Sequence, residues 1–108
     1  PGTTLVLCGN DVLAIGALRA AKALGMQVPG NISITGFDDI DIALLAEPAL
    51  TTVHVPHREM GRRAADLLLA MLRGDTVSRT TALTTRLCLR ASLGPPRDDA
   101  RGSDVQDG

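Results

Sequence analysis

The chain has 108 residues, which is enough for one small domain with a modest hydrophobic core. Hydrophobic residues make up 44% of it, which excludes disorder throughout, and the core must be aliphatic because Phe37 is the only aromatic residue. The formal net charge of -1 argues against a dedicated nucleic-acid surface in this segment, although it does not exclude a DNA-binding module elsewhere in a longer protein.

The first forty residues show the pattern of a strand, a helix and a second strand. Residues 3–8 are apolar and partly β-branched, which predicts a strand buried on both faces. Residues 11–24 repeat apolar side chains at helical spacing, with Asn10 as the N-cap candidate and Gly25 as the terminating glycine. Residues 32–37 predict the second buried strand. Such a unit is a right-handed crossover between parallel strands, so we predict an α/β fold whose parallel sheet is flanked by helices.

The second half of the chain predicts a short helix, a strand, a long helix and an edge strand. The short helix spans residues 40–46 and stops before Pro48, and the strand spans residues 51–55. The long helix runs from residue 56 to 73 and carries an apolar stripe. Residues 81–90 alternate in polarity, which is typical of an edge strand with one drier face. That face is expected to carry Leu83, Thr85, Leu87 and Leu89.

Polar side chains follow both strands of the first unit. Asn10 follows one strand and Asp38 follows the other, and ligands of open α/β sheets bind beyond the carboxyl ends of parallel strands. We therefore expect both side chains on one lip of the sheet, where a carboxylate and an amide suit a sugar or a nucleobase. Asp39 is expected to cap the helix of residues 40–46. A second interpretation remains open, in which the two aspartates only cap that helix.

The remaining polar residues do not form a pattern for catalysis or metal binding. His54 and His57 are three residues apart but lack an acidic partner in pattern, so they are interpreted as structural or exposed, and no metal site is expected. No nucleophile triad or phosphate loop is visible, so neither an enzyme nor a cofactor is predicted. Cys8 and Cys88 are interpreted as small buried thiols, with a disulfide as the alternative. No signal peptide and no membrane-spanning apolar run is visible, which favours a cytoplasmic protein without membrane contact.

Four motifs in consecutive order resemble a known family. They are "NDVLAIGALRAAKALG", "VPGNISITGFDDI", "PALTTV" and "MGRRAADLLL", and together they resemble the C-terminal part of the effector-binding domain of LacI/GalR-family transcriptional regulators. The resemblance covers residues 3–95, and several motifs in register make it more specific than any one alone. It implies a periplasmic-binding-protein-like fold of type I, in which two α/β lobes surround an effector cleft.

The resemblance also implies a division of the chain. Residues 1–94 would form a partial effector-binding and dimerisation domain, mostly of the C-terminal lobe, in which a crossover segment of residues 51–80 belongs to the N-terminal lobe. Residues 95–108 are expected to be a disordered tail. Because Pro1 opens the chain only two residues before a strand, we expect a fragment of a longer polypeptide. Operator DNA would then be bound only through an N-terminal helix-turn-helix that this chain lacks.

Particular residues match functional positions of the family. Asn10 and Asp38 match residues that contact the effector, whereas Val55 stands where many members have a glutamine that can reach it. Members form homodimers through helices that match residues 11–24 and 40–46. The matching interface residues are Ile15, Arg19, Ile42, Leu45 and Ala46. The resemblance therefore implies a DNA-binding transcriptional regulator whose effector is a sugar or a nucleobase-like molecule, with a sugar favoured.

Two rival functions share features with this pattern. A solute-binding protein of a sugar uptake system has the same fold but would need a signal peptide. A phospho-acceptor receiver domain would need a lysine after its acceptor aspartate, and Lys22, the only lysine, lies in the middle of the first predicted helix.

Overall fold

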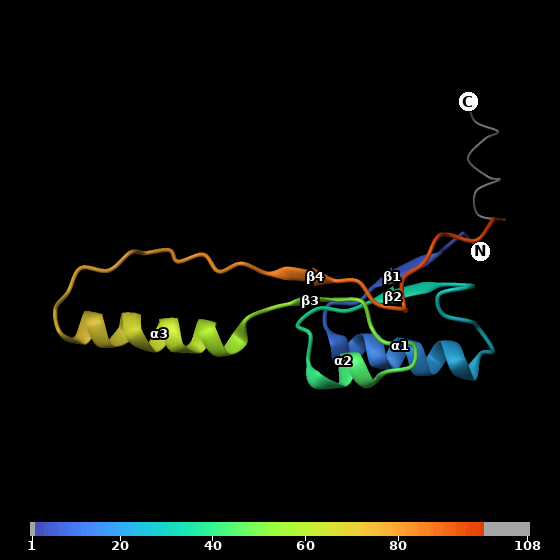
Figure 1. Cartoon of the computed structure of the whole chain (residues 1–108), viewed down its shortest axis with the longest axis horizontal. Coiled ribbons are helices and arrows are strands. Elements are labelled where there is room, and N and C mark those ends of the chain that lie inside the picture. Colours follow the sequence, from blue (N-terminus) through green and yellow to red (C-terminus); the bar gives the residue numbers. More distant parts are fainter. Residues whose placement is uncertain (1, 99–108) are drawn as a thin grey trace, which may run out of the picture.

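The computed structural model describes residues 2–98 and contains seven regular elements in this range. They are β1 (Leu5–Leu7), α1 (Asp11–Ala23), β2 (Ser33–Thr35), α2 (Asp41–Leu45), β3 (Thr52–His54), α3 (His57–Leu72) and β4 (Arg86–Cys88). Each lies within or close to a segment predicted from the sequence, although the strands are shorter (Figure 1). The predicted disorder of residues 95–108 falls mostly on residues 99–108, which lie outside the described residues.

The strands form one parallel pair, β1 and β2, and one antiparallel pair, β3 and β4. The two pairs are joined where the carboxyl end of β2 lies beside β3. β1 pairs with β2 in parallel, with Leu7 opposite Thr35. β3 continues beside β2 on its other edge through parallel bridges that join Thr35 to Thr51 and Asp38 to His54. β4 then pairs antiparallel with β3. The predicted α/β architecture with a parallel crossover is therefore confirmed.

Helices α1 and α2 cover one face of the strands, and the hydrophobic core lies beneath them (Figure 1). Its buried members are Ala14, Leu18, Ala21, Ile34, Ala43 and Leu50. The opposite face is open, since Leu7 is 75% exposed and Leu87 is 60% exposed. The prediction that residues 3–8 form a strand buried on both faces is therefore wrong, because nothing in residues 2–98 covers the second face.

The face of β4 that is buried is the opposite of the predicted one. Leu87 and Leu89 are exposed, whereas Cys88 is only 7% exposed. Side-chain contacts of the other parity accompany this orientation: the Arg90 guanidinium donates to the Asp39 carboxylate at 2.8 Å and to the Leu50 carbonyl at 3.1 Å, and the Cys88 thiol lies 3.9 Å from the Asp39 carboxylate. These polar partners lie on the inner side, and the leucines are left outside.

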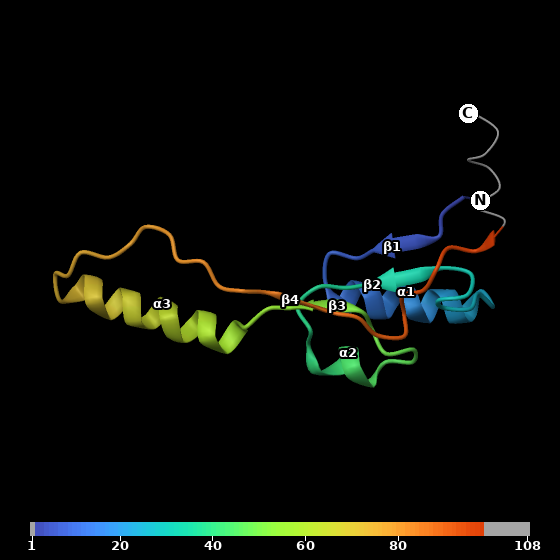
Figure 2. The ribbon, with the colours of Figure 1, turned by 45° about the horizontal axis from the view of Figure 1, so that its top comes forward.

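Helix α3 extends away from the rest of the molecule. β3 leads into it and β4 leads back, and both views show no other strand or helix beside it (Figures 1 and 2). The molecule consequently measures 63 × 37 × 17 Å, and none of the residues of α3 is buried. Glu59 and Arg63 form an ion pair one helical turn apart on its surface, with 3.3 Å between their nitrogen and oxygen atoms. Within residues 2–98, no helix combines the length and the apolar character needed to cross a membrane.

A buried carboxylate joins α1 to the strand ends. Asp11 is the first residue of α1 and is completely buried, although negative charge in a first helical turn is usually exposed to solvent at the helix end. Its carboxylate accepts from the Thr52 hydroxyl at 2.6 Å and from the Ile40 N–H at 2.8 Å. Its own N–H donates to the Phe37 carbonyl at 3.0 Å. Gly36 makes room for it, because a Cβ at that position would overlap the Asp11 carboxylate.

We predict that Gly36→Ala destabilises the fold by about 2–4 kcal/mol, through overpacking and the loss of buried hydrogen bonds of Asp11. Gly16→Ala is the matched control, because a Cβ at Gly16 meets no atom within 4 Å and alanine favours the helix by up to about 1 kcal/mol. Urea unfolding followed by circular dichroism measures both differences. Equal unfolding free energies for the two variants would contradict the role assigned to Gly36.

Candidate functional site

Asn10 and Asp38 lie at the same edge of the sheet. Leu7 and Thr35 are paired across β1 and β2. Asn10 lies three residues after Leu7, and Asp38 lies three residues after Thr35. The hydrogen bond from the Asp11 N–H to the Phe37 carbonyl joins the residues next to them. The structure therefore places the amide and the carboxylate at the carboxyl ends of adjoining parallel strands, as the strand-end pattern predicted.

Asn10 has two roles at this edge. Its extended backbone, with φ of -155°, precedes α1, and its Oδ1 accepts from the Leu13 N–H at 2.9 Å. This confirms the predicted N-cap. The side-chain oxygen is thereby occupied, whereas the amide NH2 group, at Nδ2, has no hydrogen-bond partner within residues 2–98. Asn10 can therefore offer a ligand a donor that the helix already orients.

Asp38 is held in an unusual backbone conformation. Its φ is 112°, a region that side-chain-bearing residues rarely adopt, and its N–H donates to the Val53 carbonyl at 2.9 Å. The side chain is 36% exposed, and its Oδ1 lies 3.5 Å from Nε2 of His57, the first residue of α3. Residues held in such conformations cost about 1–3 kcal/mol each and concentrate at functional sites.

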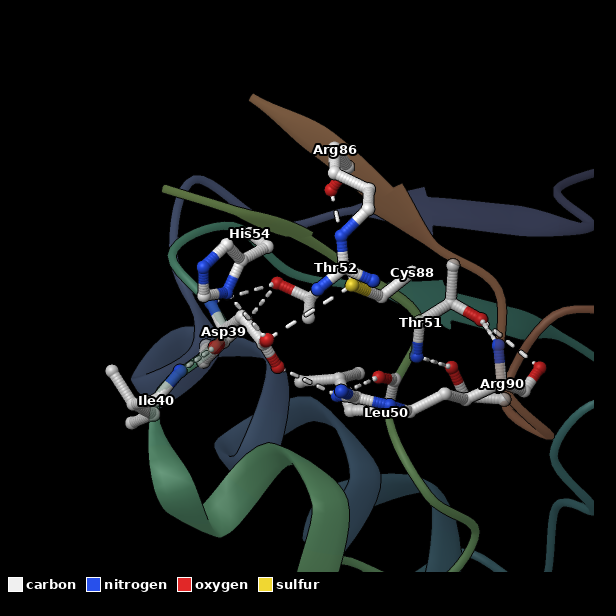
Figure 3. Close-up of polar contacts among 11 residues, drawn as sticks. Asp39, Ile40, Leu50, Thr51, Thr52, His54, Arg86, Cys88 and Arg90 are labelled. Carbon is white, nitrogen blue, oxygen red and sulfur yellow. Dashed lines mark hydrogen bonds and ion pairs between the residues drawn. The ribbon is translucent and has the colours of Figure 1, made fainter. Parts of the chain in front are cut away.

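Asp39 makes the strongest polar contacts of the edge. Its Oδ1 accepts from the Arg90 guanidinium at 2.8 Å, and its Oδ2 lies 2.9 Å from Nδ1 of His54 (Figure 3). The Cys88 thiol lies 3.9 Å from the same Oδ2. Burial raises the pKa of the Asp39 carboxyl, but the hydrogen bonds and positive charges of Arg90 and His54 outweigh burial, so its pKa lies below the usual value.

The prediction that Asp39 caps the following helix is wrong. The N-cap position of α2 is Ile40, which has no side-chain cap, and the Ile40 N–H is instead satisfied by Asp11. Asp39 is turned toward the strands because the Arg90 guanidinium and the His54 imidazole supply hydrogen-bond partners there. Sequence reasoning missed this group because its members are far apart in the chain. His54 lies 15 positions after Asp39, and Cys88 and Arg90 lie 49 or more positions after it, so the pairing of β3 with β4 is needed to bring them together.

An open hollow of about 710 Å³ lies between the end of β2 and the start of α3. Asp39, His54, His57 and Arg58 are among its lining residues, and Val55, at the position where the family often has glutamine, contributes an apolar part of the wall. Asn10 and Asp38 do not line it. The hollow therefore borders the predicted site and is connected to it through the contact of His57 with Asp38.

The five residues predicted at a dimer interface lie around one groove between α1 and α2. The groove has a volume of about 330 Å³, and its lining includes Ile15, Arg19, Ile42, Leu45 and Ala46. Leu45 is 78% exposed and Ile42 is 47% exposed, so an apolar strip faces outward there.

Both cysteines are free, Cys88 buried and Cys8 half-buried. Burial raises the pKa of the Cys8 thiol, which keeps it protonated at neutral pH. Within residues 2–98, no group of three or more His, Cys, Asp or Glu side chains is arranged to hold a metal ion.

We predict that Asp38→Gly unfolds at a higher temperature than Asp38→Ala. Both changes remove the carboxylate, but only glycine adopts the φ of 112° without strain, and the difference should be about 1–2 kcal/mol. Thermal unfolding followed by circular dichroism measures it. Asp66, an exposed residue of α3, provides the control, because there glycine should be less stable than alanine by about 1 kcal/mol. If alanine is more stable than glycine at position 38, as at position 66, then Asp38 is not strained.

Comparison with known proteins connects this geometry to a family. The model of the periplasmic binding protein-like domain matches residues 1–93. The transcriptional repressor CytR of Escherichia coli K12 is 43% identical over 90 residues, which are 82% of this chain and 26% of CytR. The chain thus spans about a quarter of the length of that relative.

Two further relatives agree. The solved complex of the transcriptional regulator CelR with cellobiose has a TM-score of 0.80 at 35% identity, over 86% of this chain and 29% of that one. The lactose operon repressor of Rhizobium radiobacter is 36% identical over 91 residues, which are 84% of this chain and 80% of that relative. The chain therefore belongs to the periplasmic binding protein-like domain family, and its relatives are LacI-family transcriptional repressors.

Proposed function

We propose that this chain is the C-terminal part of the effector-binding domain of a transcriptional regulator, and that Asn10 and Asp38 bind the effector. The observation that carries the proposal is the placement of an amide donor and a carboxylate acceptor at one edge of adjoining parallel strands. A small polar molecule with neighbouring hydroxyl or amine groups suits this pair, so the effector is a sugar or a nucleobase-like molecule, with a sugar favoured. The CelR structure, a complex with cellobiose, supports this choice of ligand class.

The extended position of α3 supports a second element of the proposal. β3 and β4 lead from the body of the molecule to α3 and back, as expected if residues 51–80 cross into a second lobe (Figure 2). The effector would then close or reorient two lobes around these strands, which is a hinge transition. Such a ligand shifts the equilibrium only by the difference between its affinities for the two states. Asp38 contacts His57 at the start of α3, so it lies where that difference can arise.

The apolar groove between α1 and α2 supports a homodimer. Its exposed members, Ile42 and Leu45, would be buried against the same surface of a second copy in a two-fold contact. Operator DNA would be bound by another region of the regulator, in the cytoplasm, and the dimer would relay the effector signal to it. A solute-binding protein of a sugar uptake system is less supported, because the relatives are transcriptional repressors.

The effector site is tested in the complete regulator that carries this segment. A thermal-shift screen with cellobiose and hypoxanthine first establishes whether a sugar or a base binds. Asp38→Asn should then weaken the effect of that probe on binding to a fluorescent operator at least tenfold, because a charge-assisted hydrogen bond contributes about 1.5–3 kcal/mol. Operator affinity without the probe should stay unchanged. Asp66→Asn, an exposed acid in α3 that does not line the hollow, is the control, and an unchanged midpoint in Asp38→Asn would refute the site.

The dimer surface is tested by a charge at its centre. Leu45→Arg should convert the dimer of the complete regulator into a monomer, because a buried unpaired guanidinium is costly in a self-complementary contact. Leu44→Arg is the matched control, since Leu44 is an exposed neighbour in α2 that does not line the groove. Analytical ultracentrifugation distinguishes the two outcomes. A Leu45→Arg protein that remains dimeric would place the interface elsewhere.

A further inference from the structure

Two consecutive aspartates occupy positive φ at the end of β2. Asp38 has a φ of 112° and Asp39 has a φ of 59°. A left-handed aspartate alone is common, but the value at Asp38 belongs to a region favoured by glycine. Helix capping does not account for this pair, since α2 has no side-chain cap. Strain of this kind persists only where the surrounding structure holds the backbone in place.

The surroundings hold this backbone through consecutive N–H groups. Asp38 donates to the Val53 carbonyl at 2.9 Å, and Asp39 donates to the Thr52 hydroxyl at 3.3 Å. Ile40 donates to the carboxylate of Asp11 at 2.8 Å. Val53 and Thr52 both belong to β3, so the conformation of Asp38 depends on β3 remaining beside the end of β2.

The Asp39 carboxylate keeps β3 and the end of β4 at that place. It binds His54 of β3 at 2.9 Å and Arg90 at 2.8 Å, and Arg90 also donates to the Leu50 carbonyl at 3.1 Å (Figure 3). The side chains of Asp39 and Arg90 are only 14% and 18% exposed, so this ion pair is shielded from solvent. The Asp38–His57 pair is more exposed, at 36% and 56%, and cannot supply the same restraint.

We propose that Asp39 is a positioning residue, which fixes both crossing segments against the end of β2 and so holds the Asp38 carboxylate in its ligand-binding orientation. The proposal rests on the effector site proposed above. The two adjacent acids then have different roles, since Asp38 is the ligand acceptor, whereas the Asp39 carboxylate lines the neighbouring hollow but is already paired with Arg90 and His54. A purely structural ion pair would stabilise the fold without setting the affinity of the site.

The charge state of Asp39 gives the proposal a pH signature. The groups that face its carboxylate are the Arg90 guanidinium, the His54 imidazole and the Cys88 thiol. Because the folded pKa of Asp39 is lowered, its stabilisation is complete above the unfolded carboxyl pKa of about 3.9 and is lost as pH falls through the lower folded pKa. The difference in unfolding temperature between the wild type and Asp39→Asn should therefore persist at pH 7 and disappear in acid.

The experiment compares Asp39→Asn with Asp38→Asn and the control Asp66→Asn in the complete regulator. Hydrogen exchange of the amides of residues 38–40 reports on the backbone, and titration with cellobiose and hypoxanthine reports on the site. Asp39→Asn should speed exchange of these amides at least tenfold more than exchange within α1, and should weaken probe binding at least tenfold. Asp38→Asn should weaken binding equally while leaving exchange slow. Asp66→Asn should change neither by more than about twofold, as expected for an exposed charge outside the hollow.

Substitutions of Arg90, the partner of Asp39, test whether the ion pair itself is required and whether a conservative replacement restores probe binding. Arg90→Met should reproduce both effects of Asp39→Asn, whereas Arg90→Lys keeps a positive charge beside the carboxylate and should recover part of the probe affinity. Unchanged exchange at residues 38–40 in Asp39→Asn, or probe affinity within twofold of the wild type, would overturn the proposal. If Asp38→Asn alone abolishes binding, the effector site stands and only the role of Asp39 fails. If neither probe binds the wild type, the effector site fails, and the exchange measurements still decide whether Asp39 holds the backbone.

Discussion

The buried carboxylate of Asp11 is the contact on which the carboxyl edge of the sheet depends. It has no exposed surface, and it accepts from the start of α2 and from β3 while its own N–H binds the end of β2. A buried carboxylate is costly unless hydrogen bonds satisfy it, so each of these contacts offsets part of the cost of burying Asp11. Gly36 is part of the same constraint, because a larger residue would exclude the carboxylate. The carboxyl edge of the sheet is therefore built as one unit with the start of α1.

Around this unit, three acids within one edge have separate environments and separate roles. Asp11 is buried and satisfied by hydrogen bonds, Asp39 is shielded and paired with Arg90, and Asp38 remains partly exposed beside His57. Exposure and partners, rather than residue type, separate the structural acids from the one that can accept a ligand. The strained backbone at Asp38 is consistent with this separation, because stability alone would favour glycine there.

The two faces of the strands also differ in a way that bears on function. One face packs against α1 and α2, and the other exposes Leu7, Leu87 and Phe37. Contiguous exposed apolar surface of this kind is normally covered by further structure or by a partner. The exposed stripe of α3 has the same character, and this helix is joined to the body only through β3 and β4 (Figure 2). Within the described residues, the polar groups at the carboxyl edge are therefore hydrogen-bonded to one another, whereas the outer face of the strands and helix α3 leave apolar side chains exposed.

Local patterns in the sequence were sufficient for the elements and for the position of Asn10 and Asp38. Helical periodicity, the N-cap at Asn10 and the glycine after α1 act within a few residues, and a parallel crossover brings the two strand ends to one edge. The burial of Asp11, the pairing of Asp39 with His54 and Arg90, and the open outer face could not be predicted in this way. Each depends on contacts between segments that are distant in the chain, such as the 41 positions between Asp11 and Thr52. Tertiary structure alone decided them, because a side chain takes the partner that folding brings nearest, and local spacing does not encode that partner.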